Sequence, residues 1–279
     1  MLLEHAHRTD GFALFVPTAS MPAMGNIYIT VEEAISRPGL RMVVVGQVPS
    51  PWSEAAKGIF HVKQIPWAGV RLAYDSQALK DWTGQRNAPV VVYDDESPRS
   101  GWAEILLLAE RLAPSPALLP KDPADRALAF GLAHEIMGQQ GLGWSRRLQL
   151  VEAGLLGRGG FDPKVAAYIG KKYGYSPQAG AAAMSRVVEL LTMLAARLKA
   201  QHAAGSPYYV GEGLSAVDIY SASALALLRP LPQEVCPMHA GTRAAFEFSE
   251  PATEAALDEV LLRHRDMMYQ RHLPLPLSL

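Results

Sequence analysis

The pattern of apolar and polar positions divides the chain into two halves with different periodicity. Between residues 41 and 112, short valine-rich runs alternate with segments whose apolar positions recur at helical spacing. The predicted order is strand, helix, strand, helix, strand, strand, helix, because proline, glycine or polar turns bound each run. Strands joined by a helix are expected to be parallel, and the last two strands are expected to form a hairpin.

The individual elements follow from these runs. In the first half we expect strands at 41–46, 68–73 and 89–93 and around Trp102, with helices at 51–63, 77–82 and 104–112. In the second half, Asp-Pro pairs at 122–123 and 162–163 are typical of helix starts, with proline in the first turn. Further helices are predicted at 178–202, 215–228 and 252–272.

This pattern predicts a small α/β domain packed on an all-helical domain. We place an irregular extension at 1–40, with a short helix over 31–36, and the α/β domain at 41–112. A linker rich in proline and alanine follows at 113–121, and the helical domain occupies 122–279.

Composition narrows the class of protein further. The chain has 279 residues, 49% of them hydrophobic, and a formal charge of −1, which is typical of a globular protein and not of one that binds nucleic acid. Uncharged apolar runs such as 105–109 are too short to cross a bilayer, and residues 1–20 lack the pattern of a signal peptide. Cys236 is the one cysteine, so we expect a reduced, cytoplasmic protein with no disulfide. No His-Glu-x-x-His motif is present, and no metal is expected.

The stretch "SPWS" at 50–53 is the first candidate for chemistry. It has the outline of a Cys-Pro-aromatic-Cys motif with both sulfurs replaced by oxygens. Ser50 before Pro51 is also what an ordinary helix start prefers, so a capping role and a chemical role both fit. We expect Ser53 to be solvated or bonded to the backbone, whereas Trp52 fits either a cleft wall or the core. Serine cannot form a mixed disulfide, which disfavours redox chemistry.

The stretch "GEGLSA" at 211–216 fits a relaxed dinucleotide-binding fingerprint, but it lacks the flanking strands that such a turn needs. A helix start explains it better. Ser215 can cap the free amides, Asp218 can accept from the Ser215 amide, and Leu214 and Ile219 stand where a hydrophobic staple closes.

The same residues carry a resemblance to a known family. Gly-x-x-x-Ser-x-x-Asp-Ile at 211–219, late in an all-helical domain and behind a β-α-β-α-β-β-α domain, resembles the cytosolic glutathione transferases, and the likeness extends over about 41–272. The resemblance implies a thioredoxin-like N-terminal domain, a helical C-terminal domain and a homodimer. In that family the Ser/Asp pair is a folding element.

The resemblance assigns roles to several residues of the first half. The segment 50–66 is similar to the first helix of omega-like transferases, where Ser50 falls on the catalytic cysteine. "NAPVVVYDD" resembles the strand that begins with a cis-proline, so Pro89 is the cis candidate and the Ala88 backbone would pair with glutathione. "WAEILLLAERL" places Glu104 at the γ-glutamyl end. Ile105 replaces the usual hydroxyl residue, and we expect its amide to receive a carboxylate.

These implications lead to a functional hypothesis. The chain is expected to be a glutathione transferase-like enzyme with glutathione as co-substrate, Ser50 stabilising the thiolate, and Trp52 in the glutathione site. A small electrophile, as in detoxification, would enter a pocket built from His134, Met137 and Trp144. The alternative is a non-catalytic binding or scaffold protein of the same fold that has lost glutathione; a peroxidase or lyase is a third interpretation. The pair Arg146-Arg147 is expected on a solvated helix face.

Overall fold

The computed structural model describes residues 27–279, so most of the expected extension at 1–40 lies outside the described residues. Its last part, residues 27–40, adds a strand and a helix to the first domain. The elements of this domain are β1 (Ile27–Tyr28), α1 (Val31–Ser36), β2 (Leu40–Val44), α2 (Pro51–Val62), β3 (Trp67–Arg71), α3 (Gln77–Thr83), β4 (Val90–Tyr93) and α4 (Trp102–Leu112).

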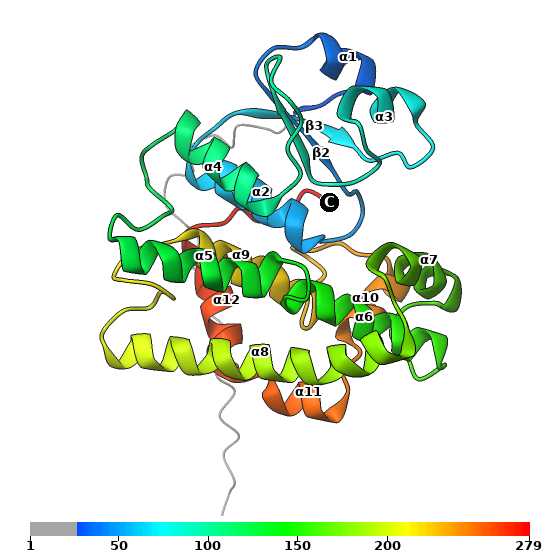
Figure 1. Ribbon diagram of the computed structural model, residues 1–279, viewed down its shortest axis with the longest axis vertical. Helices are drawn as coiled ribbons and strands as arrows, with labels where there is room; N and C mark the ends of the chain where they lie inside the picture. The colour runs from blue at the N-terminus through cyan, green and yellow to red at the C-terminus, as the bar shows by residue number, and fades with distance from the viewer. Residues whose placement is uncertain (1–26) are drawn as a thin grey trace, which may run out of the picture.

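The sheet has the strand order β1-β3-β2-β4. β2 and β3 are parallel, as expected for strands joined by a helix, whereas β4 runs antiparallel to β2, with Met42 opposite both Gly69 and Val91. Alternate residues face opposite sides, so Met42 packs with α2 and α4 while Val43 packs with α1 and α3. Every residue of β2 is buried because helices cover both faces of the sheet (Figure 1).

The expected second strand of the hairpin is reduced to a single bridge between Val91 and Arg99. Trp102, predicted in that strand, is the first residue of α4. The cause is local: Gly101 is the N-cap, and its N–H donates to the Glu104 carboxylate at 3.0 Å, which fixes the helix start at this point. Pro98, next to the bridge, has no N–H with which to extend a ladder.

The second domain is helical, as predicted, and packs against the side of α2 and α4 that faces away from the sheet (Figure 1). α9 lies at its centre and contacts α2, α5 and α12, while α6 lies along α8. The elements are α5 (Pro123–Met137), α6 (Leu142–Leu155), α7 (Pro163–Tyr173), α8 (Pro177–Ala203), α9 (Ala216–Ala224), a 3-10 turn (Leu225–Leu227), α10 (Ala240–Glu247), α11 (Pro251–Ala256) and α12 (Glu259–Arg271).

α8 is long and apolar enough, by length and composition alone, to cross a membrane, and it is the one helix in residues 27–279 that passes this test. It packs against α6, α11 and α12. Its buried positions, among them Val187, Leu191 and Leu198, recur at helical spacing on the side that faces these helices. This is the packing of a core helix.

The close approach of α2 to α9 depends on Gly58. A Cβ atom there would lie 3.0 Å from Ile219 and 2.8 Å from Leu273. We therefore expect Gly58→Val to lower the free energy of unfolding by about 1–3 kcal/mol through overpacking. Gly131 in α5 is the matched control, because a Cβ atom at that position meets no atom within 4 Å.

Gly131→Ala should raise the free energy of unfolding by about 0.5–1 kcal/mol, since glycine costs that much inside a helix. Urea unfolding of both variants measures the two effects. Similar stability for Gly58→Val and the wild type would contradict the packing argument.

Candidate functional site

Ser50 lies at the N-cap of α2, directly before Pro51. Its side chain makes no capping bond and no other hydrogen bond within residues 27–279. The residue is only 3% exposed, yet its oxygen is not among the enclosed polar atoms that lack a partner. The oxygen is therefore not fully enclosed by residues 27–279, although the residue as a whole is buried.

The backbone around Ser50 adds further donors. The first intrahelical bond of α2 runs from the Glu54 N–H to the Ser50 carbonyl at 2.8 Å. The N–H groups of Trp52 and Ser53 precede this bond and so lack a helical partner. Together with the helix dipole, they make this end of α2 favourable for negative charge.

Ser53 belongs to the interior. It is fully buried, and its hydroxyl accepts from the Val45 N–H at 3.4 Å. This contact matches the expectation of a hydroxyl bonded to the backbone. Of the two serines that replace the cysteine pair, only Ser50 can meet a ligand.

The Ala88–Pro89 peptide bond is cis, as predicted. Ala88 is partly exposed, and its N–H and C=O bond to no other group in the described part of the chain. Pro89 is buried and lines the hollow described below. A free backbone donor and acceptor at this position suit an extended peptide ligand, and the binding role of both residues stays a prediction.

The start of α4 corrects the expectation for Ile105. Its N–H is already bonded to the Gly101 carbonyl at 3.0 Å, so it has no proton to donate to a ligand carboxylate. The reason is that α4 begins at Trp102, which makes Ile105 the fourth helical residue; the free amides are those of the first three. Glu104 is exposed, and one carboxylate oxygen accepts from the Gly101 N–H.

A hollow lies between the two domains beside these elements. It encloses about 230 Å³ of space between atoms, part of it continuous with solvent, and the room that it leaves for a molecule the size of water is small. It contains four of the predicted residues and several that the sequence did not single out, and its lining is mostly apolar. The lining residues are Trp52, Ala56, Ile59, Pro89, Ser100, Trp102, Ile105, Met137 and Tyr220.

Ser100 was missed by the sequence analysis. It precedes the N-cap of α4 and lines the hollow, so it supplies a hydroxyl near the place where Ile105 had replaced one. The signal was available, because Ser100-Gly101 is a plausible helix start. Placing the helix start at Glu104 left Ser100 at the end of the polar turn at 94–100, before the expected strand around Trp102.

The three predicted pocket residues are not brought together. Met137 lines the hollow, and its carbonyl accepts from the Trp52 indole N–H at 2.8 Å. His134 is exposed, with its ring 6.5 Å from that of Trp102. Trp144 is partly buried outside the hollow, where its ring lies 4.6 Å from that of Tyr173.

Arg146 and Arg147, expected on a solvated face, are both buried. Arg146 donates from Nε to the Leu227 carbonyl at 2.9 Å and from its terminal nitrogens to Gln149 and to the Phe246 and Phe248 carbonyls. Burial lowers the pKa of Arg146 to about 9. The guanidinium thus satisfies carbonyls at two helix ends, a contact that the local charge pattern did not reveal.

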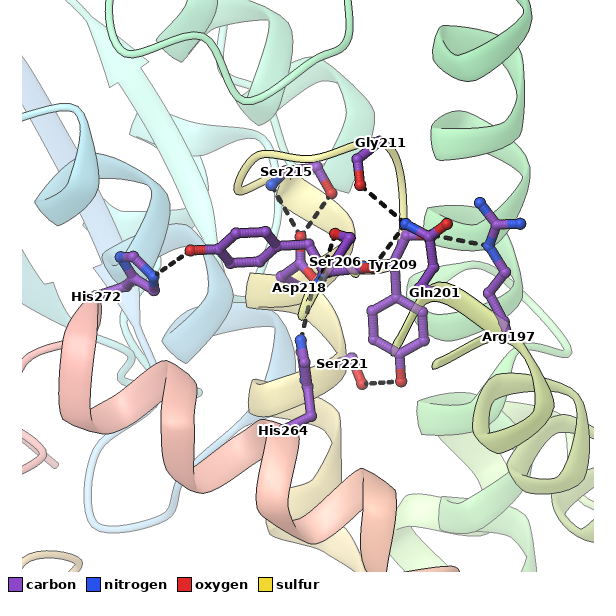
Figure 2. Close-up of polar contacts among 11 residues, drawn as sticks. Arg197, Gln201, Ser206, Tyr209, Gly211, Ser215, Asp218, Ser221, His264 and His272 are labelled. Carbon is purple, nitrogen blue, oxygen red and sulfur yellow. Dashed lines mark hydrogen bonds and ion pairs between the residues drawn. The ribbon is translucent and has the colours of Figure 1, made fainter. Parts of the chain in front are cut away.

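The Ser215/Asp218 pair is a folding element, as predicted. The Asp218 carboxylate accepts from the Ser215 N–H and hydroxyl, each at 2.8 Å, and from the Tyr209 N–H at 2.9 Å. Its fourth partner is His264 at 3.0 Å, and Figure 2 shows these groups converging on the start of α9. The element before this segment is α8 and not a strand, which contradicts a dinucleotide site.

Among residues 27–279, no group of three or more His, Cys, Asp or Glu side chains could hold a metal ion. Comparison of the sequence with protein-family models gave no match, and comparison with curated proteins gave none either.

Comparison of the structure with solved structures gave many matches to glutathione transferases. One from Methylobacillus flagellatus KT, solved with GSH bound, is 15% identical with a TM-score of 0.55 over 84% of this chain and 96% of that chain. A glutathione transferase family member from Pseudomonas fluorescens Pf-5, with two glutathione bound, is 13% identical with a TM-score of 0.51 over 88% and 98%. A glutathione S-transferase from Rhodospirillum rubrum F11 is 19% identical with a TM-score of 0.50 over 78% and 91%.

These likenesses establish the class of fold. The protein has the glutathione transferase fold, with a thioredoxin-like N-terminal domain packed on an all-helical C-terminal domain.

Proposed function

We propose that the protein is a glutathione transferase-like enzyme that adds the thiolate of glutathione to a small electrophile. The observation that carries this proposal is the state of Ser50: its hydroxyl stands at the start of α2, makes no capping bond and is not fully enclosed. In this role the hydroxyl donates its proton in a hydrogen bond to the sulfur of glutathione.

The free energy available at the start of α2 is sufficient to hold the thiol of glutathione as a thiolate. A free thiol has a pKa of about 8.5, and holding it as a thiolate at neutral pH takes a shift of about two units, or roughly 2.7 kcal/mol. A hydrogen bond to a charged group contributes about 1.5–3 kcal/mol, and a helix N-terminus adds about 0.3–1 kcal/mol. The Ser50 hydroxyl and the free amides of α2 together cover the required shift.

The rest of glutathione has suitable partners nearby. The free N–H and C=O of Ala88 would pair with the backbone of the cysteinyl residue. The γ-glutamyl carboxylate would accept from the amides at the start of α4 and from Ser100, and the free oxygen of Glu104 would accept from the ammonium. The solved structures of this fold from M. flagellatus and P. fluorescens contain glutathione, which supports the choice of co-substrate.

A second candidate is a non-catalytic binding or scaffold protein that keeps the fold without the co-substrate. Two observations favour it: the hollow is small, and the Ile105 amide is already bonded. The two candidates differ in whether glutathione binds at all.

Calorimetric titration of the protein with glutathione tests the proposal. We expect saturable binding with a dissociation constant below about 1 mM, since free donors are present at both helix starts. An ultraviolet difference spectrum of the bound thiol should show the thiolate band at neutral pH. No heat of binding at millimolar glutathione would reject the enzyme and favour the scaffold.

A further inference from the structure

Arg147 of α6 stands at the interface between the two domains. Its guanidinium lies over the rings of Trp52 and Tyr173, 5.3 and 5.5 Å from their centroids. The residue is only 9% exposed. Two aromatic faces therefore hold the cation in place, one supplied by each domain.

The hydrogen-bond donors of Arg147 have no partner among residues 27–279. Stacking uses the faces of a guanidinium, whereas its N–H groups project from the edge. Arg147 makes no hydrogen bond or ion pair within the described residues, and its Nε is fully enclosed. The neighbouring Arg146, which is fully buried, uses every one of its nitrogens. Leaving a charged donor unpaired is costly, so the two terminal nitrogens of Arg147, which are not among the enclosed atoms, are suited to an acceptor from outside the chain.

A second cation faces the same region. Lys172 of α7 has its ammonium 5.9 Å from the ring of Tyr74, which follows β3 and contacts Tyr168 edge-on. Partial desolvation, and secondly the charge of Arg147, lower the pKa of Lys172; no carboxylate contributes. Two like charges disfavour each other, and a bound anion would offset this repulsion.

Trp52 connects this cation pair to the candidate active site. The indole lines the hollow and also stacks on Arg147, and it belongs to the first turn of α2, beside Ser50. Tyr173 and Trp144, in contact with each other at 4.6 Å, add apolar ring surface on the side of the helical domain. A planar acid is the ligand that this combination of rings and cations favours.

We propose that Arg147 and Lys172 bind the carboxylate of an aromatic co-substrate whose ring lies against Trp52 and Tyr173. The inference rests on the proposed function, because it assigns a substrate class to the same site. The carboxylate accepts from the two terminal nitrogens of the guanidinium, an arrangement that favours two parallel hydrogen bonds. Lys172, which is exposed, adds a second positive charge at the solvent side of the site. The bound carboxylate thus holds the electrophilic co-substrate beside the glutathione sulfur, which accepts a hydrogen bond from Ser50.

Calorimetry with 1-naphthoate and its neutral isostere 1-naphthamide, on the full-length protein without glutathione, tests this site. We expect the acid to bind at least tenfold more tightly than the amide, Arg147→Gln to weaken the acid by tenfold or more, and Lys172→Gln to weaken it severalfold. Lys171→Gln, an exposed neighbour on α7, is the charge-matched control and should leave binding unchanged.

A separate titration with glutathione distinguishes the two sources of a carboxylate. Unchanged glutathione affinity in Arg147→Gln supports the assignment to the co-substrate. Loss of glutathione affinity alone, with naphthoate binding intact, would overturn it, as would equal affinity for naphthoate and naphthamide. If the proposed function itself is wrong, the wild type will not bind glutathione, and the same titration shows this separately. Thermal melting of each variant confirms folding, and Lys172→Gln, at the surface, keeps the test decisive if Arg147→Gln is unfolded.

Discussion

Replacing Asp218 with alanine is expected to lower the free energy of unfolding by about 3–5 kcal/mol, because several buried donors lose their shared acceptor. The carboxylate is fully buried and accepts from Ser215, Tyr209 and His264. Figure 2 shows that these partners come from the loop before α9, which ends at the N-cap Ser215, and from α12. Removing the carboxylate leaves several buried donors without an acceptor, each at a cost of about 1–3 kcal/mol.

Asp258 provides a control for this prediction. Its carboxylate caps α12 by accepting from the Val260 N–H at 2.9 Å, and it forms an exposed ion pair with Lys199. Asp258→Ala should cost about 1 kcal/mol, the usual value of a lost cap. Urea unfolding of the two variants gives both free energies. Equal losses would show that Asp218 acts as an ordinary cap and not as the centre of a buried network.

The fold was largely predictable because its central strands are visible in the sequence as apolar runs. The valine runs of β2 and β4 are buried on both sides, which makes them nearly continuous apolar segments, and Asp-Pro pairs mark two helix starts. β1 gave no such signal. It has two residues, and its pairing of Ile27 with Ala68 depends on a partner far along the chain.

The site was predictable only where a local rule decides the geometry. The helix start at Ser50 and the Asp218 contacts each follow from a short motif, whereas the cis bond at Pro89 was expected from the resemblance of residues 87–95 to the glutathione transferases. The position of Arg147 follows from no such motif, because its burial depends on Trp52 in the other domain, and a pair of arginines has the same pattern whether solvated or enclosed. The sequence analysis began α4 at Glu104. In the structure Gly101 is the N-cap, and Ser100, directly before it, lines the hollow.

The second large effect is expected for Ser50→Ala, which should lower turnover about 10- to 100-fold. The lost hydrogen bond to a charged sulfur is worth about 1.5–3 kcal/mol, and each 1.36 kcal/mol corresponds to roughly tenfold. Without the hydroxyl, the pKa of the bound thiol moves up toward about 8.5. Turnover of the variant should therefore recover as the pH is raised through that value, whereas the wild type should already be near its plateau at neutral pH.

Ser76 is the matched control because it is an N-cap serine in the same domain whose hydroxyl does cap, accepting from the Leu79 N–H at 3.1 Å. Ser76→Ala should cost about 1 kcal/mol of stability and leave turnover unchanged. Ser50→Ala should do the reverse, since its hydroxyl makes no cap bond that could be lost. Steady-state kinetics against pH, calorimetric affinity for glutathione and urea unfolding separate the two serines. If Ser50→Ala lowers glutathione affinity as much as turnover, the hydroxyl only holds the ligand, and the thiolate must be stabilised by the α2 amides alone.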